Sequence, residues 1–362
     1  MPSSNNYSFF DRILHRFAFC HPIVQKILSE LENDLFRKEL RTIHSSNEVF
    51  ITGLPRAGTT LMLELLNATG DFRTYTYRHM PFVVSPLLWN KLSRSFRKAG
   101  QKAERAHGDG MEISFDSPEA FEEVVWLTHM ADEIVGEQCL ETLSPDDITE
   151  ESADALRTSC RKLLLLAKQA GGDPQRLRYL SKNNANISRI NVLREVFPTS
   201  SVLILFRHPL AHVSSLVKQH ERFLGVHASD AFSKQYMKWI GHYEFGENFK
   251  PINFCGWLDD ADMSSPVDEN FWMRYWSTAY SYALENRTPS VQFVDFDRML
   301  QDREVSLARI AKILGLDHEE VLINAAKTLR SPTSRPLELN SCNPDVWAQA
   351  QDIHARLKSV AV

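Results

Sequence analysis

Apolar residues along this chain follow two spacings, which together predict an alternation of strands and helices. Short β-rich runs closed by polar or turn-forming residues predict strands at residues 49–52, 72–77, 178–181, 201–206 and 291–296. Apolar positions three and four residues apart predict helices, among them residues 151–170, 302–314 and 344–360, and Ser117-Pro118 predicts the start of another. Because such alternation produces parallel sheets, we expect an α/β fold with three layers and a mostly parallel central sheet flanked by helices.

The first 46 residues predict a helical N-terminal extension. Residues 8–42 form one or two helices, broken near His21-Pro22. Their apolar stripes are made of Phe9, Ile13, Phe17, Ile23, Ile27 and Leu31. We expect residues 1–46 to pack on the core of one α/β domain formed by residues 47–362, and an arm that binds a partner is the alternative.

One stretch combines a short strand, a glycine-bounded turn and a helix. Residues 49–52 are β-rich, Gly53 to Gly58 form the turn, and the apolar spacing from Thr59 onward is helical. Backbone amides and the positive end of the helix dipole converge in such a turn, which suits a phosphate. The spacing follows the P-loop pattern except that Thr59 stands at the lysine position, so the loop is poorly equipped to activate a nucleoside triphosphate. Arg56 is the one cation inside the turn, and the predicted layout is related to that of the P-loop nucleotide kinases.

At these residues the sequence resembles the sulfotransferases that use 3′-phosphoadenosine 5′-phosphosulfate (PAPS). Residues 53–61, Gly-Leu-Pro-Arg-Ala-Gly-Thr-Thr-Leu, look like their 5′-phosphosulfate loop, and the likeness runs from about residue 47 to about residue 335. The arginine at position 56 is closer to the tyrosylprotein and bacterial branch than to the cytosolic branch, which has lysine there. The resemblance implies that the 5′-phosphate is bound by Arg56, Ala57, Gly58, Thr59 and Thr60.

Two further motifs carry the resemblance. Lys182 keeps the lysine of a Lys-x-His pair that, in the cytosolic enzymes, places lysine on the sulfonate and histidine as the base. Asn184 replaces that histidine, and an amide accepts no proton at neutral pH, so the base must lie elsewhere. Arg207, followed eight residues later by Ser215, resembles the 3′-phosphate site of the superfamily. An arginine fork and a hydroxyl are what a terminal phosphate needs.

The resemblance also implies a basic loop that closes over the cofactor near residues 328–336. Arg330 and Arg335 are the candidates in this loop. The chain departs from the cytosolic branch at Leu61, where that branch keeps a tryptophan that stacks on adenine. The adenine contact is therefore unassigned.

Two histidines are candidates for the missing base. His79 follows the predicted strand 72–77, and ligands of α/β folds bind at the carboxyl ends of strands. The tyrosylprotein branch keeps an acceptor-activating glutamate in about this place. His107 lies in a glycine-hinged turn beside Asp109, which would orient its ring. A surface histidine and a plain turn are the alternatives, and the basic run within residues 91–112 is either a solvated helix face or a mobile flap over an anionic site.

Composition restricts the partners, the cellular compartment and the metal sites that we expect for the protein. A net charge of −5 argues against a nucleic-acid partner. Five scattered cysteines without a Cys-x-x-Cys pair suit a reducing cytoplasm and offer no metal or disulfide framework. The chain has no apolar run long enough to span a bilayer and no signal-peptide pattern at its start. His208, His212 and His220 lack a completing carboxylate or cysteine, so we expect no metal.

We therefore expect a cytoplasmic enzyme that moves a sulfuryl group from PAPS to a hydroxyl or amine. The acceptor is a small molecule, a carbohydrate or a peptide. Arg56 and Lys182 are expected to stabilise charge on the departing bridging oxygen. A small-molecule kinase, disfavoured by Thr59, and a non-catalytic nucleotide-binding module are the alternatives.

Overall fold

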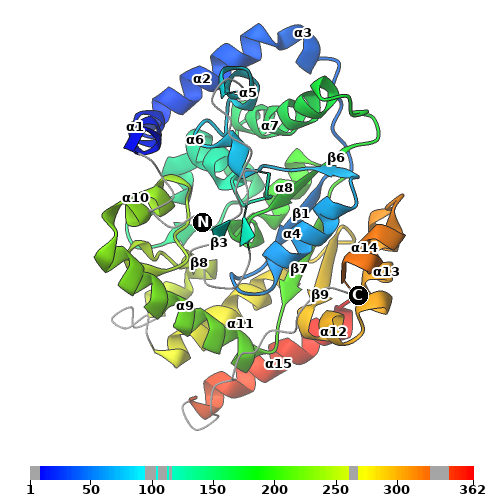
Figure 1. Ribbon diagram of the computed structural model, residues 1–362. Helices are drawn as coiled ribbons and strands as arrows, with labels where there is room; N and C mark the ends of the chain where they lie inside the picture. Colours follow the sequence, from blue (N-terminus) through cyan, green and yellow to red (C-terminus); the bar gives the residue numbers. More distant parts are fainter. Residues whose placement is uncertain (1–8, 94–102, 105–111, 114–115, 261–267, 327–341) are drawn as a thin grey trace.

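A five-stranded parallel sheet forms the centre of the molecule. The structure, a computed structural model, describes residues 9–93, 103–104, 112–113, 116–260, 268–326 and 342–362. The strand order is β2-β6-β1-β7-β9, and every neighbouring pair is parallel. The strands are β1 (Val49–Thr52), β2 (Phe72–Arg73), β6 (Arg178–Lys182), β7 (Ser201–Phe206) and β9 (Val291–Asp295). The predicted mostly parallel sheet flanked by helices is confirmed (Figure 1).

Both faces of this sheet are covered by helices, which explains why its strand β7 is apolar from Val202 to Phe206. In β7, Val202, Ile204 and Phe206 belong to one hydrophobic core, whereas Leu203 and Leu205 belong to the other. Successive side chains of a strand point to opposite faces. A strand that is buried on both faces is therefore a continuous apolar run.

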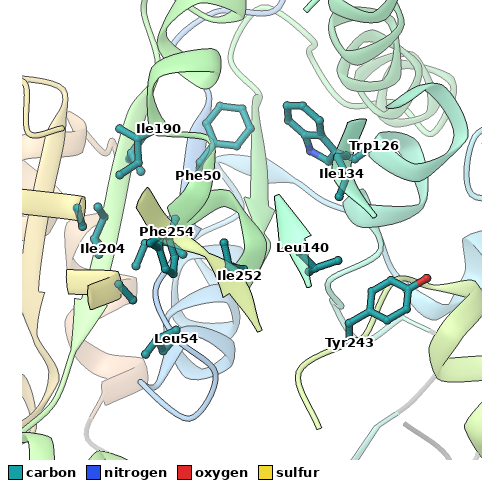
Figure 2. Close-up of a cluster of buried hydrophobic side chains, with 14 of the residues drawn as sticks. Phe50, Leu54, Trp126, Ile134, Leu140, Ile190, Ile204, Tyr243, Ile252 and Phe254 are labelled. Atoms are coloured by element: carbon teal, nitrogen blue, oxygen red, sulfur yellow. The ribbon is translucent and has the colours of Figure 1, made fainter. Parts of the chain in front are cut away.

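The helices divide between these two cores. The core around Leu203 is closed by α4 (Thr59–Ala68), α12 (Phe296–Gln301), α13 (Arg303–Leu314) and α14 (Glu319–Ala326). The larger core on the other face (Figure 2) receives side chains from α6 (Glu122–Ile134), α7 (Glu150–Gln169), α8 (Ile190–Val196), α9 (Pro209–Ser229), α10 (Ala231–Trp239), α11 (Glu269–Glu285) and α15 (Pro344–Val360). Outside the sheet lie α5 (Pro86–Ser93), the pair β3 (Ala103–Glu104) and β4 (Glu112–Ile113), and the pair β5 (Leu140–Glu141) and β8 (Ile252–Asn253).

The strand order gathers three chain segments at one edge of the sheet. β1 lies between β6 and β7, with Ile51 opposite Lys182 and Thr52 opposite Ile204. Because the three strands are parallel, their carboxyl ends meet at this edge. The loop after β1 is thus flanked by Lys182 at the end of β6 and by Arg207 just after β7.

The N-terminal helices contact the rest of the chain through buried polar side chains and, at Leu40, through a third hydrophobic cluster. They are α1 (Phe9–Ala18), α2 (Pro22–Leu35) and α3 (Arg37–Leu40), and the predicted break at His21-Pro22 is confirmed. Glu32 of α2 is fully buried and lies 3.3 Å from the Lys162 ammonium of α7. The predicted apolar stripe lies on the opposite side, where Phe9 is 74% and Ile27 54% exposed.

Two predicted elements differ from the structure for a shared reason. The predicted strand 72–77 is regular only at β2, and Tyr77–His79 forms a short 3-10 helix, η2. Thr76 instead pairs with Pro118 in an isolated antiparallel bridge. This pairing satisfies backbone groups that a helix would otherwise use, so α6 begins at Glu122 and the predicted helix start at Ser117-Pro118 is wrong.

Candidate active site

Positive φ angles fold the loop between β1 and α4 into a tight turn. The φ angles are 136° at Gly53, 71° at Arg56 and 95° at Gly58. A Cβ atom on Gly53 would lie 2.4 Å from the Leu205 carbonyl oxygen, and one on Gly58 would lie 2.2 Å from the Phe296 ring. No described side chain caps α4 at Gly58. The amides of the first helical turn are therefore suited to an anion at the positive end of the helix.

Three of the predicted binding residues meet beside this loop. Arg56 Nε donates a hydrogen bond to Ser215 Oγ at 3.2 Å. Arg207 Nη1 donates to the Arg56 carbonyl oxygen at 3.4 Å. The end of β7 and the first turns of α9 thus bring two guanidinium groups and a hydroxyl together. Such a set attracts an anion with several oxygens.

Arg207 is held in place by an acidic and an aromatic neighbour. Its side chain is buried, with Nε 3.5 Å from Asp297 Oδ1. Its guanidinium lies 5.7 Å from the centre of the Phe296 ring. A buried charge requires such partners. Asp297 also accepts a hydrogen bond from the His208 amide at 2.7 Å, which fixes the carboxylate.

His212 connects the loop after β1 to α11 through hydrogen bonds of both ring nitrogens. The Trp276 indole donates to His212 Nδ1 at 3.1 Å, so the ring proton is on Nε2, which lies 2.8 Å from the Pro55 carbonyl oxygen. Burial lowers the pKa of His212 to about 3, and the cations of Arg207 and Arg56 add to this effect. The ring is therefore neutral at physiological pH. His212 has a structural role here, because both of its ring nitrogens have protein partners.

Asn184 connects the loop to a carboxylate. Thr59 Oγ1 donates to Asn184 Oδ1 at 3.1 Å, and Asn184 Nδ2 donates to Glu244 Oε1 at 3.2 Å. Thr52 Oγ1 fixes the backbone at this point by donating to the Asn184 carbonyl oxygen at 3.1 Å. Lys182, two residues earlier, is buried at the end of β6. The position that lacks the histidine is thus linked to an acidic side chain.

A pocket opens next to Asn184. Together with its mouth it encloses about 520 Å³, between Leu54 and Pro55 of the loop and His242 and Glu244 of the segment after α10. Its other walls are mostly apolar, and they include Ala120, Leu140, Tyr243, Phe249, Ile252 and Tyr275. Figure 2 labels Leu140, Tyr243 and Ile252 among them. This volume includes the open solvent at the mouth, so the lining, rather than the volume, indicates what the pocket could bind.

His242 and Glu244 were not found by sequence reasoning. Burial lowers the pKa of His242, so its ring is neutral at physiological pH. Both residues lie in a short break between helices, bounded by Gly241 and Gly246 with φ angles of 74° and 72°. Two glycines around a histidine and a glutamate, between helical patterns, are the signal that sequence reasoning missed.

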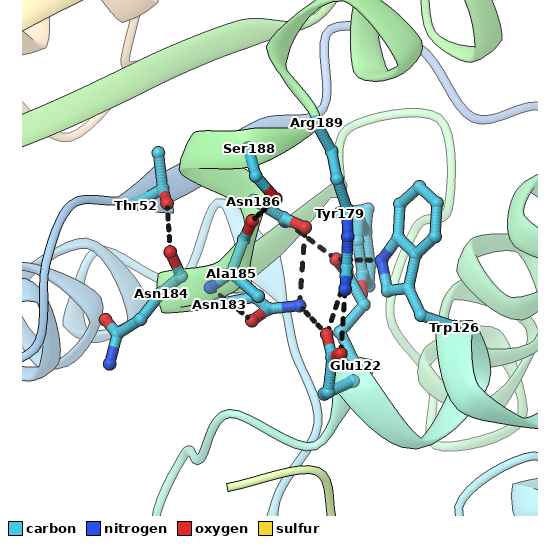
Figure 3. Close-up of polar contacts among 11 residues, drawn as sticks. Thr52, Glu122, Trp126, Tyr179, Asn183, Asn184, Ala185, Asn186, Ser188 and Arg189 are labelled. Carbon is cyan, nitrogen blue, oxygen red and sulfur yellow. Dashed lines mark hydrogen bonds and ion pairs between the residues drawn. The ribbon is translucent and has the colours of Figure 1, made fainter. Parts of the chain in front are cut away.

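A second polar network, through Glu123 and Asn183, forms part of the pocket wall. Glu123 accepts hydrogen bonds from Arg189 at 2.6 and 2.8 Å and from Asn183 at 2.7 Å. Its partners are buried, so this network satisfies charges inside the core. Figure 3 shows that the Asn184 side chain points away from this network.

The remaining predicted residues fall into two groups. His79 lies in η2, where its Nδ1 accepts a hydrogen bond from the Thr76 amide at 2.9 Å. In this arrangement the neutral ring carries its proton on Nε2 and has no free nitrogen lone pair. His107, Arg330 and Arg335 lie outside the described residues, as does most of the basic run.

Two further properties concern the described part of the chain. In it, no group of three or more His, Cys, Asp or Glu side chains is arranged to hold a metal ion. None of its helices combines the length and the apolar character needed to cross a membrane.

Comparison with known proteins identifies the family. The model of the sulfotransferase family matches residues 48–255, which is more than half of the chain. No curated protein matches the sequence. Sulfotransferase STF9 from Mycobacterium avium shares the fold, with a TM-score of 0.54 and 14% identity over 98% of this chain and 86% of that one. Sulfotransferase STF1 from Mycobacterium tuberculosis H37Rv aligns with a TM-score of 0.48 and 14% identity over 98% of this chain and 88% of that one. The chain belongs to the sulfotransferase family.

Proposed function

We propose that this sulfotransferase takes its sulfuryl group from PAPS and transfers it to an acceptor hydroxyl or amine. The observation that carries the proposal is the meeting of Arg56, Arg207 and Ser215 beside a P-loop-like turn. That turn has Thr59 where a triphosphate-binding loop has lysine. A donor with a 5′-phosphosulfate and a separate 3′-phosphate needs two anion sites, and this edge of the sheet offers both.

The two phosphates of the donor are assigned to different groups. The loop amides from Gly58 to Thr60, together with Arg56, bind the 5′-phosphate. The Thr59 hydroxyl already donates to Asn184, so Thr59 contributes its backbone amide. Arg207 and Ser215 bind the 3′-phosphate through charge-assisted hydrogen bonds.

Arg56 and Lys182 are assigned to the chemical step. In-line transfer of the sulfuryl group leaves negative charge on the bridging oxygen of the departing nucleotide. Cations aimed at that oxygen lower the barrier, by analogy with phosphoryl transfer. A sulfonate carries one negative charge, so transfer proceeds without a requirement for magnesium.

The acceptor side and the family branch are also proposals. The acceptor enters the pocket between Pro55 and Glu244, whose apolar walls favour a small molecule over a carbohydrate or a peptide. Because the loop has arginine at position 56, we assign the chain to the bacterial and tyrosylprotein-like branch of the sulfotransferases. Five free cysteines suit a cytoplasmic location.

The remaining assignments concern the basic segments, the base and the N-terminal extension. Arg330 and Arg335 are assigned to a basic loop that closes over the bound donor, and residues 91–112 to a basic flap. His107 and His79, the two bases expected from the sequence, are the alternatives to the carboxylate argued for below. Residues 1–46 are proposed as an extension of a single domain formed by residues 47–362.

Calorimetry tests the donor assignment directly. Adenosine 3′,5′-bisphosphate should bind roughly 10- to 100-fold more tightly than AMP, since a charged hydrogen-bonded phosphate contributes about 1.5–3 kcal/mol. Equal affinities would contradict the 3′-phosphate site. Tighter binding of magnesium ATP than of the bisphosphate would favour the kinase alternative.

A further inference from the structure

We infer that Glu244 is the general base of sulfuryl transfer and that its pocket takes the hydroxyl of a small, largely apolar molecule. The inference rests on the proposed PAPS donor site. It concerns the opposite reactant, and it names a residue outside the motifs that carry the family resemblance.

Asn184 fixes Glu244 relative to the donor loop. Both ends of the amide are engaged, because Oδ1 accepts from Thr59 and Nδ2 donates to Glu244 Oε1. Glu244 therefore lies two hydrogen bonds from a side chain of the phosphate-binding turn. Its second oxygen, Oε2, accepts no hydrogen bond from the described residues. A positioned carboxylate with one uncommitted oxygen on a pocket wall is suited to accept a proton.

The other titratable groups of the pocket are committed or enclosed. Both oxygens of Glu123 accept hydrogen bonds from Arg189. Lys250 donates to the carbonyl oxygens of Gly136 and Glu137 at 2.5 and 2.7 Å. His242 is 7% exposed, whereas Glu244 is half-buried and can return a proton to solvent.

Charges near Glu244 suit this role. The charges of Glu244, Glu119 and Lys182 all act on the His242 ring: the two carboxylates raise its pKa and the lysine lowers it. His242 is neutral because of its burial, so it adds no competing positive charge. Lys182 is assigned to the negative charge on the departing nucleotide, and Glu244 to the proton of the acceptor.

The pocket walls define the acceptor class. Tyr243, Phe249 and Tyr275 present aromatic surface, and Leu54 and Ile252 add aliphatic surface. Burial of such surface favours an apolar or aromatic body with one hydroxyl. Simple phenols are therefore suitable probes.

The step balances without a further reactant. The acceptor oxygen forms a bond to the donor sulfur while the bond from sulfur to the bridging phosphate oxygen breaks. The electron pair of the broken bond stays on the 5′-phosphate, beside Arg56 and Lys182. The acceptor proton passes to Glu244 Oε2 and then to water, and a sulfate ester and adenosine 3′,5′-bisphosphate are released.

Two phenols of similar shape and different acidity test the role of Glu244. Both phenols are assayed at pH 8. At this pH 4-methylphenol keeps its proton, whereas 4-nitrophenol is largely ionised and needs no base. With saturating PAPS, Glu244→Gln should lower kcat for 4-methylphenol by about 10²- to 10⁴-fold. Its kcat for 4-nitrophenol should change less than about fivefold, and its affinity for adenosine 3′,5′-bisphosphate should be unchanged.

Matched variants separate this role from folding and from the other candidates. Glu247→Gln removes an exposed carboxylate three residues away that pairs with Lys234, and it should leave both rates unchanged. His79→Ala and His107→Ala should also keep the ratio of the two rates. An equal loss with both phenols, an unchanged rate in Glu244→Gln, or a His79 or His107 variant that loses only 4-methylphenol transfer would overturn the assignment. A wild-type protein that binds the bisphosphate but sulfates neither phenol would overturn the acceptor class. Failure to bind the bisphosphate would instead contradict the donor proposal.

Discussion

Lys182 and Arg207 follow the strands on either side of β1, and this placement gives them different roles. Lys182 ends β6 beside Asn184 and the acceptor pocket. Arg207 follows β7 and donates to the Arg56 carbonyl oxygen of the loop, whose side chain in turn donates to Ser215. One cation is thus near the proposed reacting group, and the other is near the proposed 3′-phosphate.

Lys182→Ala should lower kcat by about 10²- to 10³-fold while changing the affinity for adenosine 3′,5′-bisphosphate much less. Charge on the bridging oxygen develops only in the transition state, so its loss affects rate more than binding. Initial-rate assays at saturating PAPS measure kcat, and calorimetry measures the affinity for adenosine 3′,5′-bisphosphate. A variant that loses affinity but keeps its rate at saturation would make Lys182 a binding residue only.

Arg207→Ala should remove the preference for adenosine 3′,5′-bisphosphate over AMP. The bisphosphate should bind about 10- to 100-fold more weakly, because it loses a charge-assisted contact, while AMP affinity should stay the same. Calorimetry with both nucleotides measures the difference, and Lys218→Ala, an exposed cation on α9, is the control. A similar loss for both nucleotides would place Arg207 outside the 3′-phosphate site.

At the scale of elements, the turn between β1 and α4 depends on Gly58. Gly58→Ala should lower both thermal stability and nucleotide affinity, because its φ is 95° and a Cβ would meet the Phe296 ring. Gly70→Ala is the matched control, since Gly70 has a φ of 84° but no atom within 4 Å of an added Cβ. Melting temperatures of the two variants separate backbone strain from the clash. Equal losses in both would show that the contact with Phe296 is unimportant.

Periodicity predicted which segments are helices and strands better than it predicted what those elements contact. β1 and β7 carry apolar side chains on both faces of the sheet, so their sequence alone identified them. In contrast, the stripe through Phe9 and Ile27 identified helices but not their packing face, which is the polar side with Glu32. The bridge between Thr76 and Pro118 joins segments far apart in sequence, which no local pattern reports.

The same limit applies to the site. Arg56, Lys182 and Arg207 were predictable because they lie at or just beyond the ends of strands of the sheet, where short motifs are readable. Glu244 lies between helices, far from these motifs, and only the fold brings it to Asn184. Acceptor-side residues come from such loops, so their identity requires the structure.

At the scale of the whole molecule, His212 couples stability to pH. Its pKa is lowered from 6.5 to about 3 by burial, so the unfolded chain binds a proton that the native chain does not. The stability that depends on neutral His212 is complete above pH 6.5 and is lost as pH falls toward 3. The slope is about 1.4 kcal/mol per pH unit in this window.

Urea denaturation at pH 6.5 and pH 5 measures this coupling. The free energy of unfolding should fall by roughly 2 kcal/mol more in the wild type than in His212→Gln, which has no titrating group at this position. A glutamine amide can still accept from Trp276 and donate to the Pro55 carbonyl oxygen. Equal pH dependence in the two proteins would contradict a buried neutral His212.

Transfer of labelled sulfur from PAPS tests the central claim most directly. PAPS labelled in its sulfur is incubated with the protein, with the two phenols and with a chelator of divalent metals. Our account predicts that the label moves to a phenol, that one equivalent of adenosine 3′,5′-bisphosphate is released, and that Lys182→Ala transfers far more slowly. Label that remains on PAPS while labelled phosphate moves from magnesium ATP to the same phenols would contradict it.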